Sequence, residues 1–187
     1  MTDVRTRKTT RQNSMALSVS TMGGWKPKKT PFELMTTRRK RIEFVDDDGI
    51  RKAVSADGWG YGGGVGSGRK VVARISDLVV ELHEEGGVHW LLVSYRPAKV
   101  PGSGFKTPWR SAGNNQQRAR VEFALVDRNN AALRSGRFDL RFDCKESGNP
   151  RSSSEPIAEG SPSPRDVFRR SVAVELAATT KMIWERC

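Results

Sequence analysis

The sequence predicts a mainly β fold, an antiparallel sandwich or barrel with one or two short helices, and three observations support this prediction. Several short segments alternate apolar and polar residues, which is typical of strands with one buried face. Loops rich in glycine, serine and proline separate these segments. One further segment carries the signals of a helix start. Short strands joined by turn-rich connections are typical of antiparallel sheets.

The predicted strands are Ile42–Val45, Val71–Leu82, Val88–Tyr95, Arg120–Asp127, Arg137–Cys144 and the alternating residues Val172, Val174 and Leu176. The alternation is clearest in Arg137–Cys144, where apolar side chains occupy every second position from Phe138 and charged residues stand between them. Val71–Leu82 and Val88–Tyr95 are longer apolar runs, which predicts central strands joined by a hairpin loop at Glu84–Gly87. Ser163 as an N-cap, Pro164 and Asp166 predict a helix of about two turns.

The charge of the chain is strongly positive and unevenly placed. Lysine and arginine number 33 against 21 aspartate and glutamate, a net charge of +12 with a pI near 10.3. This excess indicates a polyanion or an anionic surface as a partner. Residues 1–45 hold +8 of it, and residues 1–41 are predicted to be a flexible, disordered basic arm. Residues 42–187 are expected to form a single β-rich core domain, with a glycine-rich loop at 57–70 and a Ser/Pro-rich loop at 146–164.

Several classes of protein are excluded by composition. No run reaches the roughly 18 apolar residues of a membrane span, and no signal-peptide segment follows the charged N-terminus. Two cysteines and two histidines, at Cys144, Cys187, His83 and His89, provide no disulfide framework and no ligand cluster for structural zinc. Cys144 ends an alternating strand, so it is interpreted as a small core residue and not as a nucleophile.

The segment Gly63–Lys70 has the glycine content of a phosphate-binding loop. Arg69 stands where that motif has its lysine, Lys70 replaces the Ser or Thr that holds magnesium, and no hydrophobic strand precedes the segment. We therefore interpret it as a flexible linker in which Arg69 and Lys70 contact phosphate without specificity. No nucleotide hydrolysis, no cofactor, no metal and no enzymatic activity are expected.

Two predicted strands end in distinctive residues, Tyr95-Arg96-Pro97 and Leu125-Val126-Asp127. A glycine at the next turn, Gly136, the strand that follows it and the segment 163–182 complete an order of elements that resembles the 30K superfamily of plant-virus movement proteins, over about Val71–Met182. The resemblance implies a jelly-roll-like β core whose Leu-x-Asp signature is Leu125 and Asp127. It also implies binding of single-stranded nucleic acid without sequence preference, transport of a viral genome through plasmodesmata, and peripheral association with the endoplasmic reticulum.

The resemblance is incomplete at the C-terminus, because family members continue beyond the strand that corresponds to Val172–Met182. We expect either that another segment, such as the N-terminal region, supplies a strand, or that the sandwich is partly open. An open edge favours self-association, so a homo-oligomer is expected. The glycine-rich stretch Asp57–Gly68 has no counterpart in the family pattern.

Asp127 can be interpreted without the resemblance. It shares the alternation of Val121, Phe123 and Leu125, which predicts that it points toward the core at the end of its strand. A carboxylate there needs hydrogen-bond donors or a cation. We expect it to accept backbone N–H groups from the turn at Arg128–Asn130. Acid–base catalysis is not expected, because no second carboxylate, histidine or nucleophile can be placed beside it.

The candidate nucleic-acid contacts are cations near aromatic residues, because cations neutralise phosphates and aromatic rings stack on bases. The first group is Lys26, Lys28 and Lys29 beside Trp25, followed by the quartet Arg38, Arg39, Lys40 and Arg41. The second group is Lys106, Arg110, Arg118 and Arg120 with Phe105 and Trp109. The quartet also fits a solvated face or a nuclear-targeting signal, and Trp25 and Trp109 also fit plain packing. Anionic lipid competes for the same cations.

The predicted function is therefore that of a viral cell-to-cell movement protein. Its expected partners are single-stranded viral RNA or DNA, the surface of plasmodesmal and endoplasmic-reticulum membrane, and further copies of itself. Its expected location is the host cytoplasm, the periphery of the endoplasmic reticulum and the plasmodesmata. Two alternatives remain, a small viral capsid protein with a basic RNA-packaging arm and an RNA-binding silencing suppressor.

Overall fold

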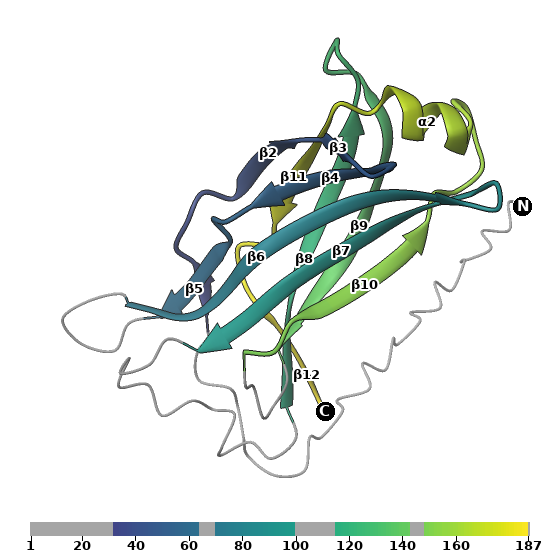
Figure 1. Ribbon diagram of the computed structural model, residues 1–187. Coiled ribbons are helices and arrows are strands. Elements are labelled where there is room, and N and C mark those ends of the chain that lie inside the picture. Colours follow the sequence, from purple (N-terminus) through teal and green to yellow (C-terminus); the bar gives the residue numbers. More distant parts are fainter. Residues whose placement is uncertain (1–31, 64–69, 100–114, 143–147, 187) are drawn as a thin grey trace, which may run out of the picture.

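A computed structural model describes residues 32–63, 70–99, 115–142 and 148–186, which form two layers of antiparallel strands with one short helix (Figure 1). The seven-stranded sheet contains β1 (Glu33–Leu34), β3 (Val45–Asp47), β4 (Ile50–Ser55), β5 (Trp59–Gly63), β6 (Lys70–Glu85), β7 (Val88–Lys99) and β10 (Arg151–Pro156). The five-stranded sheet contains β2 (Arg39–Glu43), β8 (Asn115–Val126), β9 (Ala132–Phe142), β11 (Ala173–Ala178) and β12 (Ile183–Arg186). The predicted mainly β, antiparallel fold is confirmed.

Each sheet is organised around one long strand. β6 pairs with β5 and β4 along one side and with β7 along the other, and β10 lies beyond β7. β8 pairs with β9 on one side and with β11 and β12 on the other, and β2 lies beyond β11. β9 and β10 are therefore edge strands of their sheets. The one helix among the described residues, α2 (Pro164–Arg170), lies in the connection from β10 of one sheet to β11 of the other.

The core lies between the two sheets, because alternate residues of each strand face the other layer. The seven-stranded sheet contributes fully buried residues such as Tyr61, Leu78 and Leu82, and the five-stranded sheet contributes Leu125 and Leu140. Two tyrosine hydroxyls also join the layers. Tyr61 donates to the carbonyl of Thr179 at 2.9 Å, and the backbone N–H of Arg141 donates to the hydroxyl of Tyr95 at 2.7 Å.

Two predicted local structures are confirmed. β6 and β7 form the expected hairpin, and its turn residues Gly86 and Gly87 have φ of 58° and 80°, which glycine adopts without strain. Helix α2 begins where predicted. The Ser163 hydroxyl accepts from the N–H of Asp166 at 3.2 Å, and Pro164 occupies the start of the helix.

The predicted arm and loops are too long. The arm was expected to reach residue 41, but β1 and β2 are strands, and β2 forms a continuous register with β11 from Arg39 to Glu43. The interpretation of residues 57–70 as a loop is wrong for Trp59–Gly63, which form β5 because the Trp59 and Tyr61 side chains are buried in the core. The loop predicted at 146–164 contains strand β10, because Arg151–Pro156 pair with β7 although their sequence is serine-rich.

Part of the predicted segments lies outside the described residues, namely 1–31, residues 64–69 of the glycine-rich loop, residues 143–144 of the strand predicted at Arg137–Cys144, and residues 146–147 of the Ser/Pro-rich loop. In the described ranges, no helix has the length and apolar character that crossing a bilayer requires. β2, which begins in the predicted N-terminal arm, pairs with the edge of β11 opposite to β8. The N-terminal region therefore does supply a strand to the core domain.

Candidate nucleic-acid interface

The outer face of the five-stranded sheet carries a regular array of arginines. In β2 and β9 the residues that face away from the core include Arg39, Arg41, Arg137 and Arg141, all of them exposed. Cross-strand register aligns three of these arginines in two rows, Arg39–Ala177–Glu122–Arg137 and Arg41–Glu175–Ala124–Ser135, and it places Arg141 opposite Arg118. Small or acidic residues on β8 and β11 thus separate arginines on β2 from an arginine on β9.

Some of these arginines already have carboxylate partners. Arg41 lies 3.3 Å from Glu175, and Asp139 accepts from Arg118 at 2.7 Å and from Arg120 at 3.2 Å. The Arg41–Glu175 pair is exposed and contributes little to stability, so a phosphate can compete for Arg41. The two pairs of Asp139 are partly buried.

Three arginines of this face lack such partners. Within the described part of the chain, no carboxylate lies within 4 Å of Arg39, Arg137 or Arg141. In a single copy of the chain, their charges are therefore available to an anion. A guanidinium also matches the geometry of a phosphate, which it can contact through two N–H groups.

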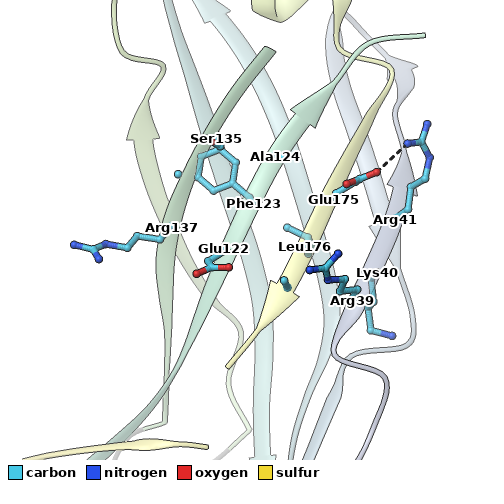
Figure 2. Close-up of a pocket in the computed structure, with 12 residues that line it drawn as sticks. Arg39, Lys40, Arg41, Glu122, Phe123, Ala124, Ser135, Arg137, Glu175 and Leu176 are labelled. Carbon is cyan, nitrogen blue, oxygen red and sulfur yellow. Dashed lines mark hydrogen bonds and ion pairs between the residues drawn. The ribbon is translucent and has the colours of Figure 1, made fainter. Parts of the chain in front are cut away.

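A groove of about 910 Å³ runs over the middle of this sheet (Figure 2). Arg39 and Arg41 of β2 lie on one side, Glu122 and Glu175 in the middle, and Arg137 of β9 on the other side. The Arg137 side chain extends away from β8, past the outer side of β9 (Figure 2). Arg137 also lines a second groove, of about 620 Å³, between β9 and β10. We call the surface formed by these two grooves, with Arg39, Arg41, Arg137 and Arg141, the arginine face.

The basic quartet does not form one cluster. Because β2 is extended, its residues alternate between faces. Arg39 and Arg41 point outward, whereas Lys40 is half-buried with its ammonium 6.0 Å from the centre of the Trp59 ring. Arg38 donates from Nε to the carbonyl of Ala178 at 3.1 Å, which anchors the entry to β2. Only two of the four side chains thus lie on the arginine face.

The other predicted basic residues fall into two groups. Arg118 and Arg120 lie on β8 beside Asp139, and Arg120 lines the second groove of the arginine face. Lys70 is the first residue of β6, in the other sheet. The remaining predicted contacts lie outside the described residues: Lys26, Lys28, Lys29, Arg69, Lys106 and Arg110.

Asp127 has the structural role that its position predicts. Its Oδ1 accepts the backbone N–H groups of Asn129 at 2.9 Å and Ala131 at 3.0 Å. Its Oδ2 accepts from Arg170 of helix α2 at 3.2 Å. The bond from Ala131 first, then those from Asn129 and Arg170, hold the pKa of the carboxyl below its usual value, although partial desolvation acts in the opposite direction. Asp127 therefore joins the β8–β9 turn to the end of α2.

The other two residues of the predicted signature also have structural roles. Leu125 is fully buried in the core. Gly136 lies directly opposite Phe123 across the β8–β9 ladder, so a side chain at residue 136 would meet the ring. Gly136 is thus inside strand β9 and not at a turn, which corrects the expected position.

Arg137 and Arg141 are candidate contacts that sequence reasoning missed. The alternation of the Arg137–Cys144 segment already predicted that both side chains face away from the core. What the sequence did not indicate is that β9 and β2 belong to the same sheet. Their arginines lie on one face only because β11 pairs with both β2 and β8.

Comparison of the chain with models of protein families, with curated proteins and with solved structures found no match.

Proposed function

We propose that the protein binds single-stranded nucleic acid without sequence preference and carries a viral genome between plant cells. The observation that carries the binding part is the arginine face, where Arg39, Arg137 and Arg141 lack carboxylate partners and line two adjoining grooves. Arginines at the sides of a groove favour contact with the phosphate backbone, which is independent of sequence.

The distribution of charge supports the same proposal. The described residues include 22 Lys and Arg and 18 Asp and Glu, so they hold +4 of the net charge of +12. The folded surface is thus only mildly basic as a whole, and the arginine face is a local concentration. The other +8 belongs to residues outside the described ranges, mostly to residues 1–31, which we propose as a second set of phosphate contacts.

The transport part of the proposal depends on the resemblance to the 30K superfamily. We propose that the core is jelly-roll-like and that the protein works as a homo-oligomer. We propose plasmodesmata and the surface of the endoplasmic reticulum as its site of action. The neighbouring positions of β2 and β11, the first and a late strand of the same sheet, favour a two-sheet β-sandwich core. β6 and β7 form a hairpin, and β5 and β4 both pair with the other side of β6, an order that differs from a regular double Greek key.

The binding proposal is tested with the variant R39Q/R137Q/R141Q and a mixed-sequence single-stranded RNA. A matched control, R74Q/R165Q/R169Q, removes three exposed arginines that lie elsewhere. Fluorescence anisotropy over a salt series should show a shallower dependence of log affinity on log salt for the first variant, by about 2 if three phosphate contacts are lost. Equal slopes for both triple variants would exclude the arginine face as the binding surface.

Transport is tested by complementation of a movement-defective virus with the same two variants and a fluorescent fusion of the wild-type chain. Wild type and control should restore spread of the virus, and the fluorescent fusion should lie at plasmodesmata. R39Q/R137Q/R141Q should not restore spread. A small capsid protein shares a β-sandwich and a basic segment. Closed particles in electron micrographs, without complementation, would favour that function instead. Tighter binding of short duplexes than of single strands would favour a silencing suppressor.

A further inference from the structure

The two edge strands β9 and β10 lie along the same side of the sandwich. β9 pairs only with β8 and β10 only with β7 among the described strands, and both line the groove of about 620 Å³. An edge strand presents unpaired N–H and C=O groups, which are a template for pairing with another chain. Charged side chains on an edge oppose such pairing unless the partner strand carries complementary charges.

Tyr95 shows which backbone groups of β9 face outward. The N–H of Arg141 donates to the Tyr95 hydroxyl and not to β8, so Arg141 points its backbone groups away from the sheet. By the two-residue period of a strand, Asp139 and Arg137 present their N–H and C=O groups in the same direction. The Tyr95 hydroxyl occupies the edge at Arg141, so the open part of the edge is centred on residues 137–139.

The charges of this open edge are self-complementary. If a second copy of β9 pairs antiparallel about a two-fold axis at Phe138, Arg137 of each copy lies opposite Asp139 of the other. These two residue pairs would each exchange two backbone hydrogen bonds. Asp139 already accepts from Arg118 and Arg120, but a carboxylate has about four acceptor sites and retains capacity for a further guanidinium.

β10 has the same property. Its sequence Arg151-Ser152-Ser153-Ser154-Glu155 places opposite charges at equal distances from Ser153. Antiparallel pairing of two copies about Ser153 puts Arg151 of each opposite Glu155 of the other, and Ser152 opposite Ser154. Glu155 is exposed and has no ion pair within the described residues.

One two-fold axis can serve both edges. Tyr95 places Arg141 and Arg151 at the same level, because its hydroxyl bonds to Arg141 and its Cα is the register partner of Arg151. Phe138 lies three residues from Arg141, and Ser153 lies two residues from Arg151. At about 3.3 Å per residue the two centres differ in height by roughly 3 Å, which a modest tilt of the axis accommodates.

We propose that two copies of this chain associate side by side through β9 and β10, so that each sheet continues into the corresponding sheet of the second copy. This deepens the self-association of the proposed function by naming its surface. The interface itself does not require nucleic acid. Its tests are therefore carried out without nucleic acid, and their failure would leave the binding proposal unaffected.

The register is tested by disulfide trapping in a C144S/C187S background. S153C places two thiols directly opposite each other at the axis, where cross-strand Cβ atoms lie about 4.5–5.5 Å apart. S152C and S154C are matched controls on the same strand, because each lies opposite the other residue and not opposite itself. Under mild oxidation S153C should form a covalent dimer several times faster than either control, and the double variant S152C/S154C should also crosslink.

Charge complementarity is tested by sedimentation of E155R, R151E/E155R and the exposed control E159R. E155R sets Arg151 against an arginine at both symmetric positions, and it should weaken the dimer about tenfold. R151E/E155R restores opposite charges and should recover most of the affinity, while E159R makes the same charge change away from the edge. A wild-type chain that stays monomeric, equal crosslinking of S152C, S153C and S154C, or equal effects of E155R and E159R would each overturn the interface.

Discussion

Phe123 and Gly136 face each other across the β8–β9 ladder, and a Cβ added at Gly136 would lie 2.7 Å from the Phe123 ring. The ring is nearly buried and packs against Phe138 at a centroid distance of 6.0 Å, so it has little room to move. A cross-strand aromatic that covers a glycine on an edge strand is a known stabilising arrangement. This pair explains why β9 tolerates a glycine in its middle.

Gly136→Ala should therefore destabilise the protein, although alanine usually stabilises a strand relative to glycine. We expect the free energy of unfolding in urea to fall by about 1–3 kcal/mol, the usual cost of overpacking. In an F123L background the same substitution should cost less, because the smaller side chain leaves space for the methyl group. Equal costs in both backgrounds would show that the ring is not the obstacle.

Asp127 should stabilise the fold in a pH-dependent manner. A carboxyl whose native pKa is lowered stabilises the protein above its unfolded pKa, about 3.9, and that stabilisation is lost as the pH falls through the lower native value. The difference in unfolding free energy between wild type and D127N should therefore be largest near neutral pH and shrink below pH 4. D127A should be less stable than D127N, because alanine leaves two backbone N–H groups without an acceptor.

The matched control for this series is D57N, an exposed carboxylate on another loop. Its effect on stability should be small at every pH. If D127N and D57N behave alike between pH 3 and pH 7, the contact of Asp127 with Arg170 and the β8–β9 turn does not stabilise the native state.

Tyr61 should make the fold sensitive to alkali. Burial raises the pKa of its hydroxyl to about 12. A group with a raised native pKa stabilises the protein below its unfolded pKa, about 10, and this contribution is lost as the pH rises to the native value. Roughly 2–3 kcal/mol of stability should be lost between these values. In a difference absorbance titration, wild type should show a phenolate step near pH 12 that Y61F lacks. A step near pH 10 would contradict the burial of this hydroxyl.

Residues of the basic quartet should differ in their effect on binding, because alternate residues of β2 face opposite sides of the sheet. R39Q removes an outward charge beside the groove, so the salt dependence of RNA binding should become shallower by about 0.7 while stability stays unchanged. K40Q removes an ammonium that lies over the Trp59 ring, so it should lower stability by about 0.5–1 kcal/mol and leave the salt dependence unchanged. A continuous linear signal, such as a nuclear-targeting sequence, would be affected similarly by both substitutions.

The local structures that the sequence predicted well are those coded by neighbouring residues. Period-two alternation located the inner strands, and a serine–proline–aspartate start located α2, because strand faces and helix caps depend on residues close together in the chain. Asp127 was likewise predicted to bond its own turn. Each of these requires no knowledge of which strands pair.

The predictions that failed concern elements whose structure depends on distant partners. Trp59–Gly63 has three glycines in five residues, yet it is a strand because β6 and the core hold its two aromatic side chains. Arg151–Pro156 shows no apolar alternation, and pairing with β7 alone defines it as a strand. The arginine face was missed for the same reason, since it needs the order of β2, β11, β8 and β9 in the sheet.

The pairing of β2 with β11 has a consequence for synthesis of the chain. Arg41 and Glu175, register partners across these strands, are separated by 134 residues. At about 5–20 residues per second, a ribosome needs on the order of ten seconds to make the residues between them. During that interval β2 has no β-sheet partner, and its arginines are exposed to any polyanion nearby. We therefore expect nucleic acid that is bound early to delay closure of the five-stranded sheet, and refolding should be slower when single-stranded RNA is present from the start.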